Sequence, residues 1–463
     1  MTAKTADEWK SLPWKKFQKV LFRLQHRIYK AAKNDDSNSV KQLQNLLIGS
    51  KCSKYLAVRQ ITQLNVGRRT AGIDGISSLN PKERLLLVND LDQMKNWKHR
   101  KLKRVYIADG KRKRPLGIST IRDRAMQCLV KYALEPVYEA YASEGTFGSR
   151  PGYSTWDVQN RLFQNLKASA NGSNKIILEV DLECCFDEID HNAMMSRVTL
   201  PGVAKRFLRT ALEAGVLKER DKTLKSTPQG GVISPLLCNI ALHGIENLNN
   251  EWAYSRWYQR GFRYVDDMVF ILKPGECQER LLNKVKDFLQ ERGMKVSEAK
   301  TRFTSPLSGF DFLGWHFKVK AKNNKFVCYP SEKNRRQMIK KIKDTMKNSK
   351  YKIKDRLEKV KVIYRGWWNY HKYSDMKQIN LWSIREWVYR YVKKNTNIVG
   401  KEIIEYLQSI FNGHTYKVNR YPAIGGNLSV YDGNFVFWSK RNSKLYRYYL
   451  KKTGLLWVEL YGQ

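Results

Sequence analysis

The chain has 463 residues, 42% of them hydrophobic, which is enough to build roughly two to four compact units. Its 86 Lys and Arg residues against 43 Asp and Glu give a formal net charge of +43, so nucleic acid is the leading partner. No apolar run approaches the roughly 20 residues that cross a bilayer, and the opening residues lack the apolar core of a signal peptide. We therefore expect no membrane partner and a cytoplasmic protein, or an organellar one in a eukaryote.

The stretch from Trp14 to Lys33 is predicted to be a basic amphipathic helix. Its apolar residues recur at helical spacing, and most of its Lys and Arg residues fall on other faces. An ordinary surface helix is the alternative interpretation. The segment RRTAGIDGI (68–76) combines the basic pair Arg68 and Arg69 with two glycines. It predicts a loop that approaches another backbone closely, with the two arginines available to nucleic acid.

Two stretches of β-strand composition carry aspartates. Residues 176–182 (IILEVDL) are an apolar run with Asp181 near its end, and residues 262–272 (FRYVDDMVFIL) are two short runs around Asp266 and Asp267. The second stretch predicts a tight hairpin with both carboxylates at its tip. Adjacent carboxylates repel each other unless a cation binds there, so the pair is a candidate magnesium site. An exposed acidic turn is the alternative for an Asp-Asp pair considered by itself.

Beyond Pro330 the pattern changes to long basic helices. They are RRQMIKKIKDTMKN, IKDRLEKVKVIYRGWWNYHKY and LWSIREWVYRYVKK. Basic residues are enriched after Lys320, which predicts a domain boundary near that residue. The tail, 421–463, is aromatic and basic and is typical of short strands and turns. The seven cysteines include no CxxC pair, and most lie in apolar stretches, so we expect reduced core thiols and no zinc site.

Several motifs follow one another in a defined order along the chain. They are RPLGISTIRDRAMQ (114–127), FGSRPGYST (147–155), EVDLECCFDEIDH (179–191), TPQGGVISPLLCNIAL (227–242), FRYVDDMVF (262–270), MKVSEAKT (294–301) and FDFLGWHF (310–317). This ordered set, over residues 15–400, resembles the reverse transcriptases encoded by group II introns. The resemblance implies an α+β fold. Its fingers and palm, with an antiparallel sheet, form a right-hand polymerase, and an α-helical thumb follows.

The resemblance assigns the polymerase chemistry to three carboxylates. Asp181, Asp266 and Asp267 match the catalytic, metal-binding aspartates, and the Leu182 carbonyl matches a further ligand. Nucleotidyl transfer uses two divalent cations about 4 Å apart, one lowering the pKa of the attacking hydroxyl and one holding the triphosphate. We expect two Mg²⁺ ions, with Mn²⁺ as the alternative.

The resemblance also implies contacts with the incoming deoxynucleoside triphosphate. The matching residues are Arg114, Phe186, Gln229 and Lys300. Arg114 would bind phosphate bidentately, and Phe186 would exclude a 2′-hydroxyl. A core position is the alternative for Phe186, and a surface loop position for Gln229 and Lys300. The lysine that the family carries ahead of the RPLG motif is absent here, and Lys111 or Lys113 is the candidate substitute.

Nucleic-acid contacts are expected in two further motifs. Arg150 lies in FGSRPGYST, where the resemblance implies contacts with the template strand. GWWNYHKYS (366–374) resembles a segment of the thumb called domain X. With the preceding residue it supplies Arg365, Trp367, Tyr370 and Lys372. Such aromatic residues can stack on bases while the cations meet phosphates. Burial of the aromatic residues in the core is the alternative.

The combined pattern predicts four regions. They are an N-terminal extension with the basic helix and a template-contacting loop (1–75), reverse transcriptase fingers and palm (76–325), a thumb or maturase domain X (326–420), and a basic, aromatic, DNA-binding-like tail (421–463). The tail contains no His and no Cys, so we expect no HNH endonuclease of the kind that many relatives carry.

The predicted function is that of an RNA-directed DNA polymerase and maturase. The protein would bind group II intron RNA, assist its splicing, and copy it into target DNA during retrohoming, using deoxynucleoside triphosphates. Two alternatives stay open. One is a related reverse transcriptase domesticated for DNA repair or defence. The other is an RNA-binding splicing cofactor without polymerase activity.

Overall fold

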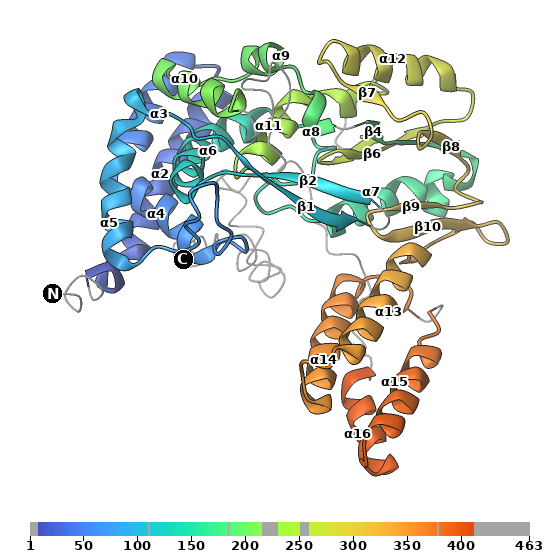
Figure 1. Ribbon diagram of the computed structural model, residues 1–463. Coiled ribbons are helices and arrows are strands. Elements are labelled where there is room, and N and C mark those ends of the chain that lie inside the picture. Colours follow the sequence, from blue (N-terminus) through green and yellow to red (C-terminus); the bar gives the residue numbers. More distant parts are fainter. Residues whose placement is uncertain are drawn as a thin grey trace.

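The computed structural model describes residues 8–109, 112–183, 185–214, 230–250, 259–376 and 379–411. The N-terminal part is a body of helices, at the left of Figure 1. In chain order it contains α2 (Trp14–Lys33), α3 (Ser37–Gly49), α4 (Lys51–Arg59), the π-helical turn η1 (Gln60–Leu64), α5 (Pro81–Asp90), the 3₁₀ helix η2 (Leu91–Asn96) and α6 (Ile121–Tyr141). Helix α2 buries Leu21 and Ile28 while Arg23 and Arg27 stay exposed, which confirms the predicted basic amphipathic helix.

An antiparallel pair of strands and the loop 68–76 lie next to α6. The strands are β1 (Lys103–Asp109) and β2 (Arg112–Ile118). A Cβ atom added at Gly72 would lie 2.7 Å from Cα of Thr120, so the loop approaches the start of α6 as predicted. Arg124 of α6 holds this connection by donating hydrogen bonds to the carbonyls of Gly67 (3.0 Å) and Thr70 (2.6 Å).

The central sheet is antiparallel, with the strand order β5-β6-β3-β8 among the described residues. Its strands are β3 (Ile176–Val180), β5 (Gly261–Tyr264), β6 (Asp267–Leu272) and β8 (Arg302–Thr304), and a small separate sheet pairs β4 (Leu182–Glu183) with β7 (Lys295–Val296). The helical elements around them are α7 (Thr155–Leu166), η3 (Ala168–Ala170), η4 (Gly172–Asn174), α8 (Cys185–Glu188), α9 (His191–Ser196), α10 (Gly202–Leu212), α11 (Ser234–Ala241), η5 (Ile245–Asn247) and α12 (Gln278–Gln290).

A further sheet leads into a helical unit that projects from the main body in Figure 1. The sheet has the order β11-β10-β9 and contains β9 (Phe310–Phe312), β10 (Trp315–Lys320) and β11 (Lys325–Pro330). The helical unit contains α13 (Glu332–Lys347), α14 (Ile353–Tyr370), α15 (Trp382–Asn395) and α16 (Gly400–Phe411). Three of these helices match the predicted ones, and α16 was not predicted.

The predicted boundaries near Lys320 and at 325/326 are too early. Strand β11 pairs along its whole length with β10, so the chain crosses both positions inside one hairpin. The helical unit begins only where the Ser331 side chain caps α13 by accepting a hydrogen bond from the Asn334 backbone. The shift in charge composition therefore came close to the start of the helical unit and missed the end of the sheet by several residues.

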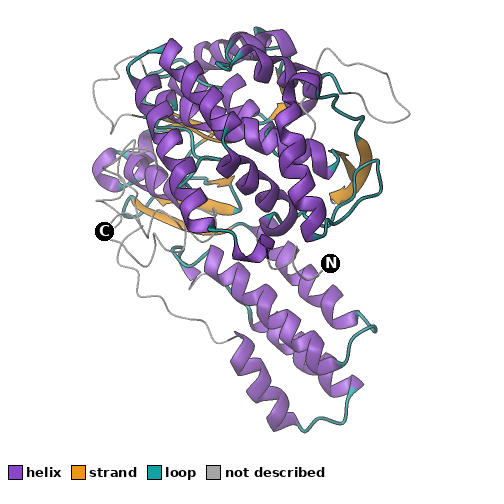
Figure 2. Ribbon diagram, turned by 90° about the vertical axis from the view of Figure 1, so that its left-hand side faces the viewer, coloured by secondary structure: helices purple, strands orange, loops and turns teal. Residues whose placement is uncertain are grey.

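The described residues form three hydrophobic clusters. Alternate residues of β3 divide between the first two: Leu178 joins a cluster with the N-terminal helices, and Ile177 joins one with β9, β10, β11 and α7. In β6, Phe270 and Ile271 divide in the same way. The third cluster lies within the four helices α13 to α16. The central sheet is thus covered on both faces, and helices dominate the side of the molecule that Figure 2 presents.

The mixture of helices and antiparallel sheets confirms the predicted α+β class. Among the described helices, none combines the length and the apolar character that a bilayer crossing requires. Cys128, Cys185, Cys238 and Cys328 are buried free thiols as expected, whereas Cys277 is exposed. The tail predicted at 421–463 lies outside the described residues.

Candidate active site

The hairpin predicted around the Asp-Asp pair is present. Tyr264 at the end of β5 pairs with Asp267 at the start of β6, so Val265 and Asp266 form a two-residue turn. Val265 has a φ of 63°, in the left-handed region that a β-branched residue rarely adopts. The strands behind this turn are mostly buried, so the two aspartates lie at the tip of a hairpin that the core holds in place.

Strand β3 brings Asp181 to the same end of the sheet. Val180 lies opposite Met268 in the β3–β6 ladder, so the next residue, Asp181, comes beside Asp267. The Asp181 backbone carbonyl accepts a hydrogen bond from the Ser297 backbone N–H (2.8 Å). Lys300 Nζ lies 3.1 Å from both carboxylate oxygens of Asp181. The structure therefore brings together the three predicted aspartates and the predicted lysine.

The electrostatics of the tip favour a bound cation. The Asp267 side chain reaches solvent, yet the protein around it raises the pKa of its carboxyl, and the negative charges of Asp266 and Asp181 raise it further, to about 6. Lys300 and Lys333 act in the opposite direction and only partly offset this rise. A cation bound among the three carboxylates would remove the repulsion between them.

The donor set suits a hard divalent cation. Carboxylate oxygens are the ligands that Mg²⁺ prefers, and burial together with the neighbouring carboxylates raises the pKa of Asp267. In the part of the chain that the structure describes, no three His, Cys, Asp or Glu side chains have the spacing of a formed metal site. Leu182 follows Asp181 in β4, with its side chain buried and its backbone paired with Val296.

The side chains of several predicted residues are not described. Gln229 lies outside the described residues, and for Arg114 in β2 and Phe186 in α8 only the backbone elements are described. Arg68 and Arg69 are exposed on the loop that approaches α6, as a nucleic-acid contact requires.

Arg150 is a correction to the sequence-based prediction, because it is a buried structural residue. Its guanidinium forms a bidentate ion pair with Glu139 of α6, with nitrogen–oxygen distances of 2.9 to 3.2 Å. The remaining nitrogen donates to the carbonyls of Ser143 (3.0 Å) and Thr146 (2.8 Å). Since its side chain is only 2% exposed and its nitrogens bond to protein groups, Arg150 is a structural residue at the edge of a cleft that it helps to line.

The aromatic residues Trp367 and Tyr370 of GWWNYHKYS make contacts inside the protein and keep part of their surface exposed. Tyr370 stacks on Trp315 of β10 at a ring distance of 4.6 Å, and its hydroxyl donates to the Leu313 carbonyl (2.8 Å). The Trp367 indole donates to Asn334 Oδ1 of α13 (2.6 Å) and packs against the third cluster. Both side chains are partly buried: Tyr370 packs the helical unit against β10 and also lines a cleft, and Trp367 packs within the helical unit.

The two basic residues of that segment, Lys372 and Arg365, differ in their exposure to solvent. Lys372 Nζ lies 4.3 Å from the centre of the Trp156 ring, so it packs against α7. Arg365 is exposed on α14. Of the four predicted contacts in this segment, Arg365 is therefore the one that solvent and a ligand can reach freely.

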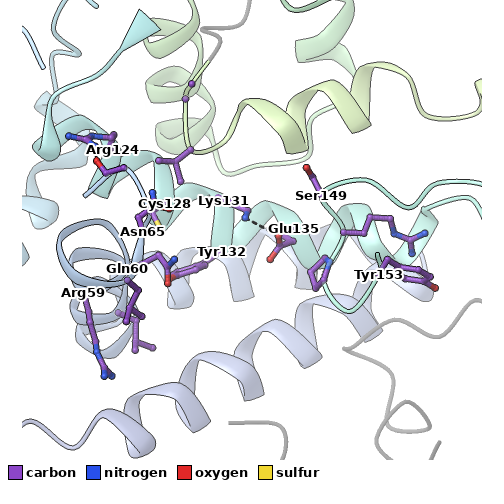
Figure 3. A pocket seen from close by; sticks show the side chains of 18 of the residues that line it. Arg59, Gln60, Asn65, Arg124, Cys128, Lys131, Tyr132, Glu135, Ser149 and Tyr153 are labelled. Carbon is purple, nitrogen blue, oxygen red and sulfur yellow. Dashed lines mark hydrogen bonds and ion pairs between the residues drawn. The ribbon is translucent and has the colours of Figure 1, made fainter. Parts of the chain in front are cut away.

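A cleft of about 840 Å³ is lined by the N-terminal helices, the β5–β6 hairpin and the helical unit. Tyr264 lines it from the hairpin, Gly366 from α14, and Gly230 from the segment that opens α11. Figure 3 shows other parts of its lining: Arg59, Gln60, Asn65, Arg124, Cys128, Lys131, Tyr132, Glu135, Ser149 and Tyr153. The Lys131–Glu135 pair (3.3 Å) gives the α6 wall of the cleft both charges.

Sequence analysis overlooked the buried pair of Arg263 and Glu246 directly behind the hairpin. Arg263 Nε lies 2.6 Å from Glu246 Oε1, and both side chains are 0% exposed. An arginine within the β-strand run that precedes Asp266 was the available signal, because a charge in a buried strand requires a partner.

Three family models match successive parts of the chain. "N-terminal domain of reverse transcriptase" matches residues 9–91, and "Reverse transcriptase (RNA-dependent DNA polymerase)" matches residues 103–317. "Group II intron, maturase-specific domain" matches residues 335–396. The central match contains all three aspartates, and the last lies within the helical unit.

Individual proteins match as well. The chain is 33% identical over 370 residues to Maturase-like protein 1 of Euglena gracilis, covering 79% of this chain and 78% of that protein. It is 31% identical over 204 residues to the Group II intron-encoded protein LtrA of Lactococcus lactis subsp. cremoris, covering 42% and 33%. A solved structure of telomerase from Candida albicans matches with a TM-score of 0.38 at 13% identity, over 69% of this chain and 62% of that one.

Proposed function

This chain belongs to the reverse transcriptases with a group II intron maturase domain, and we propose that it copies group II intron RNA into DNA at Asp181, Asp266 and Asp267. As a family member it is an RNA-directed DNA polymerase and maturase, and reverse transcriptases use divalent metal ions. The observation that carries the site assignment is the convergence of three mutually repelling carboxylates at one end of β3 and β6.

The three carboxylates would hold two Mg²⁺ ions, with the Leu182 carbonyl as an additional ligand. When bound, these ions lower the pKa of the primer 3′-hydroxyl and offset the charge that develops on the triphosphate. Lys300, now paired with Asp181, would turn toward the phosphates. Arg114 would bind the same phosphates through its planar guanidinium, while Gln229 and Phe186 would line the nucleotide pocket.

The cleft is proposed to hold the template and primer. It runs from the N-terminal helices past Tyr264 to Gly366. Its lining includes Gly67, Thr70 and Gly366, which are the chain neighbours of the exposed Arg68, Arg69 and Arg365. Structured intron RNA would bind the basic outer faces of α2 and of the helices from α13 onward. Target DNA would be contacted by the tail, 421–463, and the intron would reach it by retrohoming.

Iron-directed cleavage tests the metal assignment without measuring activity. Fe²⁺ with ascorbate and peroxide generates hydroxyl radicals that cut the backbone close to the bound ion. We expect cuts near Asp181 and near residues 264–267, suppressed by excess Mg²⁺. The cuts should disappear in Asp267→Ala and persist in Asp287→Ala, which removes an exposed aspartate from α12. Fragments that are identical in wild type and Asp267→Ala would place the ion elsewhere.

Sugar selection tests the role proposed for Phe186. Phe186→Val should lower the preference for deoxynucleotides over ribonucleotides by about 10- to 200-fold, the range that small steric differences in a pocket produce. The measurement is the ratio of single-nucleotide incorporation efficiencies on one RNA template. Phe163→Val, a matched truncation that packs beside Phe326, should leave this ratio unchanged. A folded Phe186→Val protein with the wild-type ratio would remove the residue from the nucleotide pocket.

A further inference from the structure

The turn that carries the catalytic aspartates is strained. Val265 is one of its two residues and has a φ of 63°. A β-branched side chain in this region crowds its own backbone, and such conformations persist only where the surrounding structure holds them. Because Asp266 follows Val265 directly, any relaxation of Val265 would move both carboxylates.

Arg263 is the residue that holds the turn from inside. Its Nη1 donates a hydrogen bond to the Val265 carbonyl (3.0 Å) and another to Asn239 Oδ1 (2.8 Å). Its Nε donates to Glu246 Oε1 at 2.6 Å. One planar guanidinium therefore joins the strained turn to α11 and to η5 at once.

Neighbouring segments lock this arrangement in place. The Thr146 hydroxyl donates to Glu246 Oε1, and Arg263 Nη2 lies 3.3 Å from the same hydroxyl oxygen. Asn239 Nδ2 donates to the Gly148 carbonyl (2.8 Å). A Cβ atom added at Gly148 would lie 2.4 Å from the Val265 backbone nitrogen, so this segment presses directly against the turn.

The pair is charged despite complete burial. Burial alone would lower the pKa of the Arg263 guanidinium, but Glu246 raises it above its ordinary value. Burial alone would also raise the pKa of Glu246, but Arg263 holds it below its ordinary value. Two buried charges are costly to desolvate, so their presence directly behind the hairpin calls for a role beyond packing.

We propose that Arg263, anchored by Glu246 and Asn239, is a positioning residue that fixes the Val265 turn and so sets the placement of Asp266 and Asp267. It acts through the Val265 carbonyl and does not contact substrate. The proposal rests on the assignment of these aspartates as metal ligands. It also requires the fork of an arginine, because a lysine ammonium cannot bond Glu246, Asn239 and Val265 in the same geometry.

The test compares Arg263→Lys with Arg260→Lys. Arg260 lies at the opposite end of the hairpin and pairs with Glu276 at 2.5 Å, so it is a partly buried arginine of the same stretch that does not touch the turn. Both variants keep the charge. The readouts are the rate of primer extension at varied Mg²⁺, Mn²⁺ binding followed by electron paramagnetic resonance, RNA affinity, and Tm.

Arg263→Lys is expected to lose about 10- to 100-fold in extension rate or metal affinity, as for other residues that orient metal ligands. RNA affinity should stay at the wild-type value, and Arg260→Lys should match wild type in extension and Mn²⁺ binding. If Arg263→Lys does not fold, the neutral pair Arg263→Gln with Glu246→Gln takes its place, because it leaves no unpaired buried charge. Extension and Mn²⁺ binding equal to those of Arg260→Lys would overturn the proposal.

A second substitution separates positioning from general stability. Glycine adopts positive φ without steric cost, so Val265→Gly should restore part of the extension and Mn²⁺ binding that Arg263→Lys removes. Equal impairment with and without Val265→Gly would show that Arg263 does not act through the turn. Asp267→Ala is assayed alongside: if it also extends primers normally, the metal assignment has failed. If it is inactive while Arg263→Lys is normal, only the positioning role has failed.

Discussion

Asp266→Asn and Asp267→Asn are each expected to abolish primer extension on an RNA template, with a loss of at least about 10³-fold. A metal ion contributes several kcal/mol of transition-state stabilisation, and each 1.36 kcal/mol corresponds to tenfold in rate. The substitution keeps the size of the side chain and removes the charged ligand. The measurement is single-turnover extension at saturating deoxynucleotide and Mg²⁺.

RNA binding should separate from catalysis in the same variants. Affinity for structured RNA depends on many phosphate contacts spread over the basic surface, so removing one charge at the hairpin tip changes it little. Asp287→Asn on α12 is the matched control, since it removes an exposed aspartate far from the hairpin in sequence and should extend normally. Full extension by Asp266→Asn or Asp267→Asn would remove that residue from the set of metal ligands.

Local patterns predicted the elements that carry the site. The spacing of apolar residues predicted helix α2, and an acidic pair between two apolar runs predicted the β5–β6 hairpin. Both features depend on neighbours along the chain. The second and third clusters bury large aromatic residues such as Trp315 and Tyr364. The resemblance implied the α+β class, and local patterns were enough to place these elements along the chain.

Side-chain roles that depend on distant partners were not accessible. Arg150 reads as a surface cation until Glu139 of α6 is placed against it, and Tyr370 reads as a stacking platform until Trp315 covers its ring. Arg263 was instead overlooked, because its buried ion pair with Glu246 is visible only in the folded structure. In each case the deciding contact joins two separate elements of the fold, and local sequence patterns do not show which elements pack together.

Affinity for structured RNA is expected to fall steeply with salt. With a net charge of +43, the protein should neutralise six or more phosphates, and the bound counterions are then released. For roughly six to ten contacts, affinity should drop by about 10³- to 10⁵-fold between about 50 and 200 mM salt. Fluorescence anisotropy with a labelled intron RNA, at several KCl concentrations, measures the slope directly.

The slope also locates the charges that bind. Lys340 and Lys341 are exposed on α13, and replacing both with Gln should reduce the slope by about two, close to one for each phosphate that the variant no longer neutralises. The effect should be similar for unrelated RNAs, because phosphate contacts position a partner without specifying its sequence. Lys286→Gln is the control, since Lys286 already pairs with Glu298 at 2.8 Å.

A slope near zero for the wild type would mean that the excess charge serves something other than phosphate binding. If the wild-type slope is steep and the Lys340/Lys341 variant has the same slope, the RNA does not bind at these residues of α13. Another basic face would then bind it, and α2 is the next candidate.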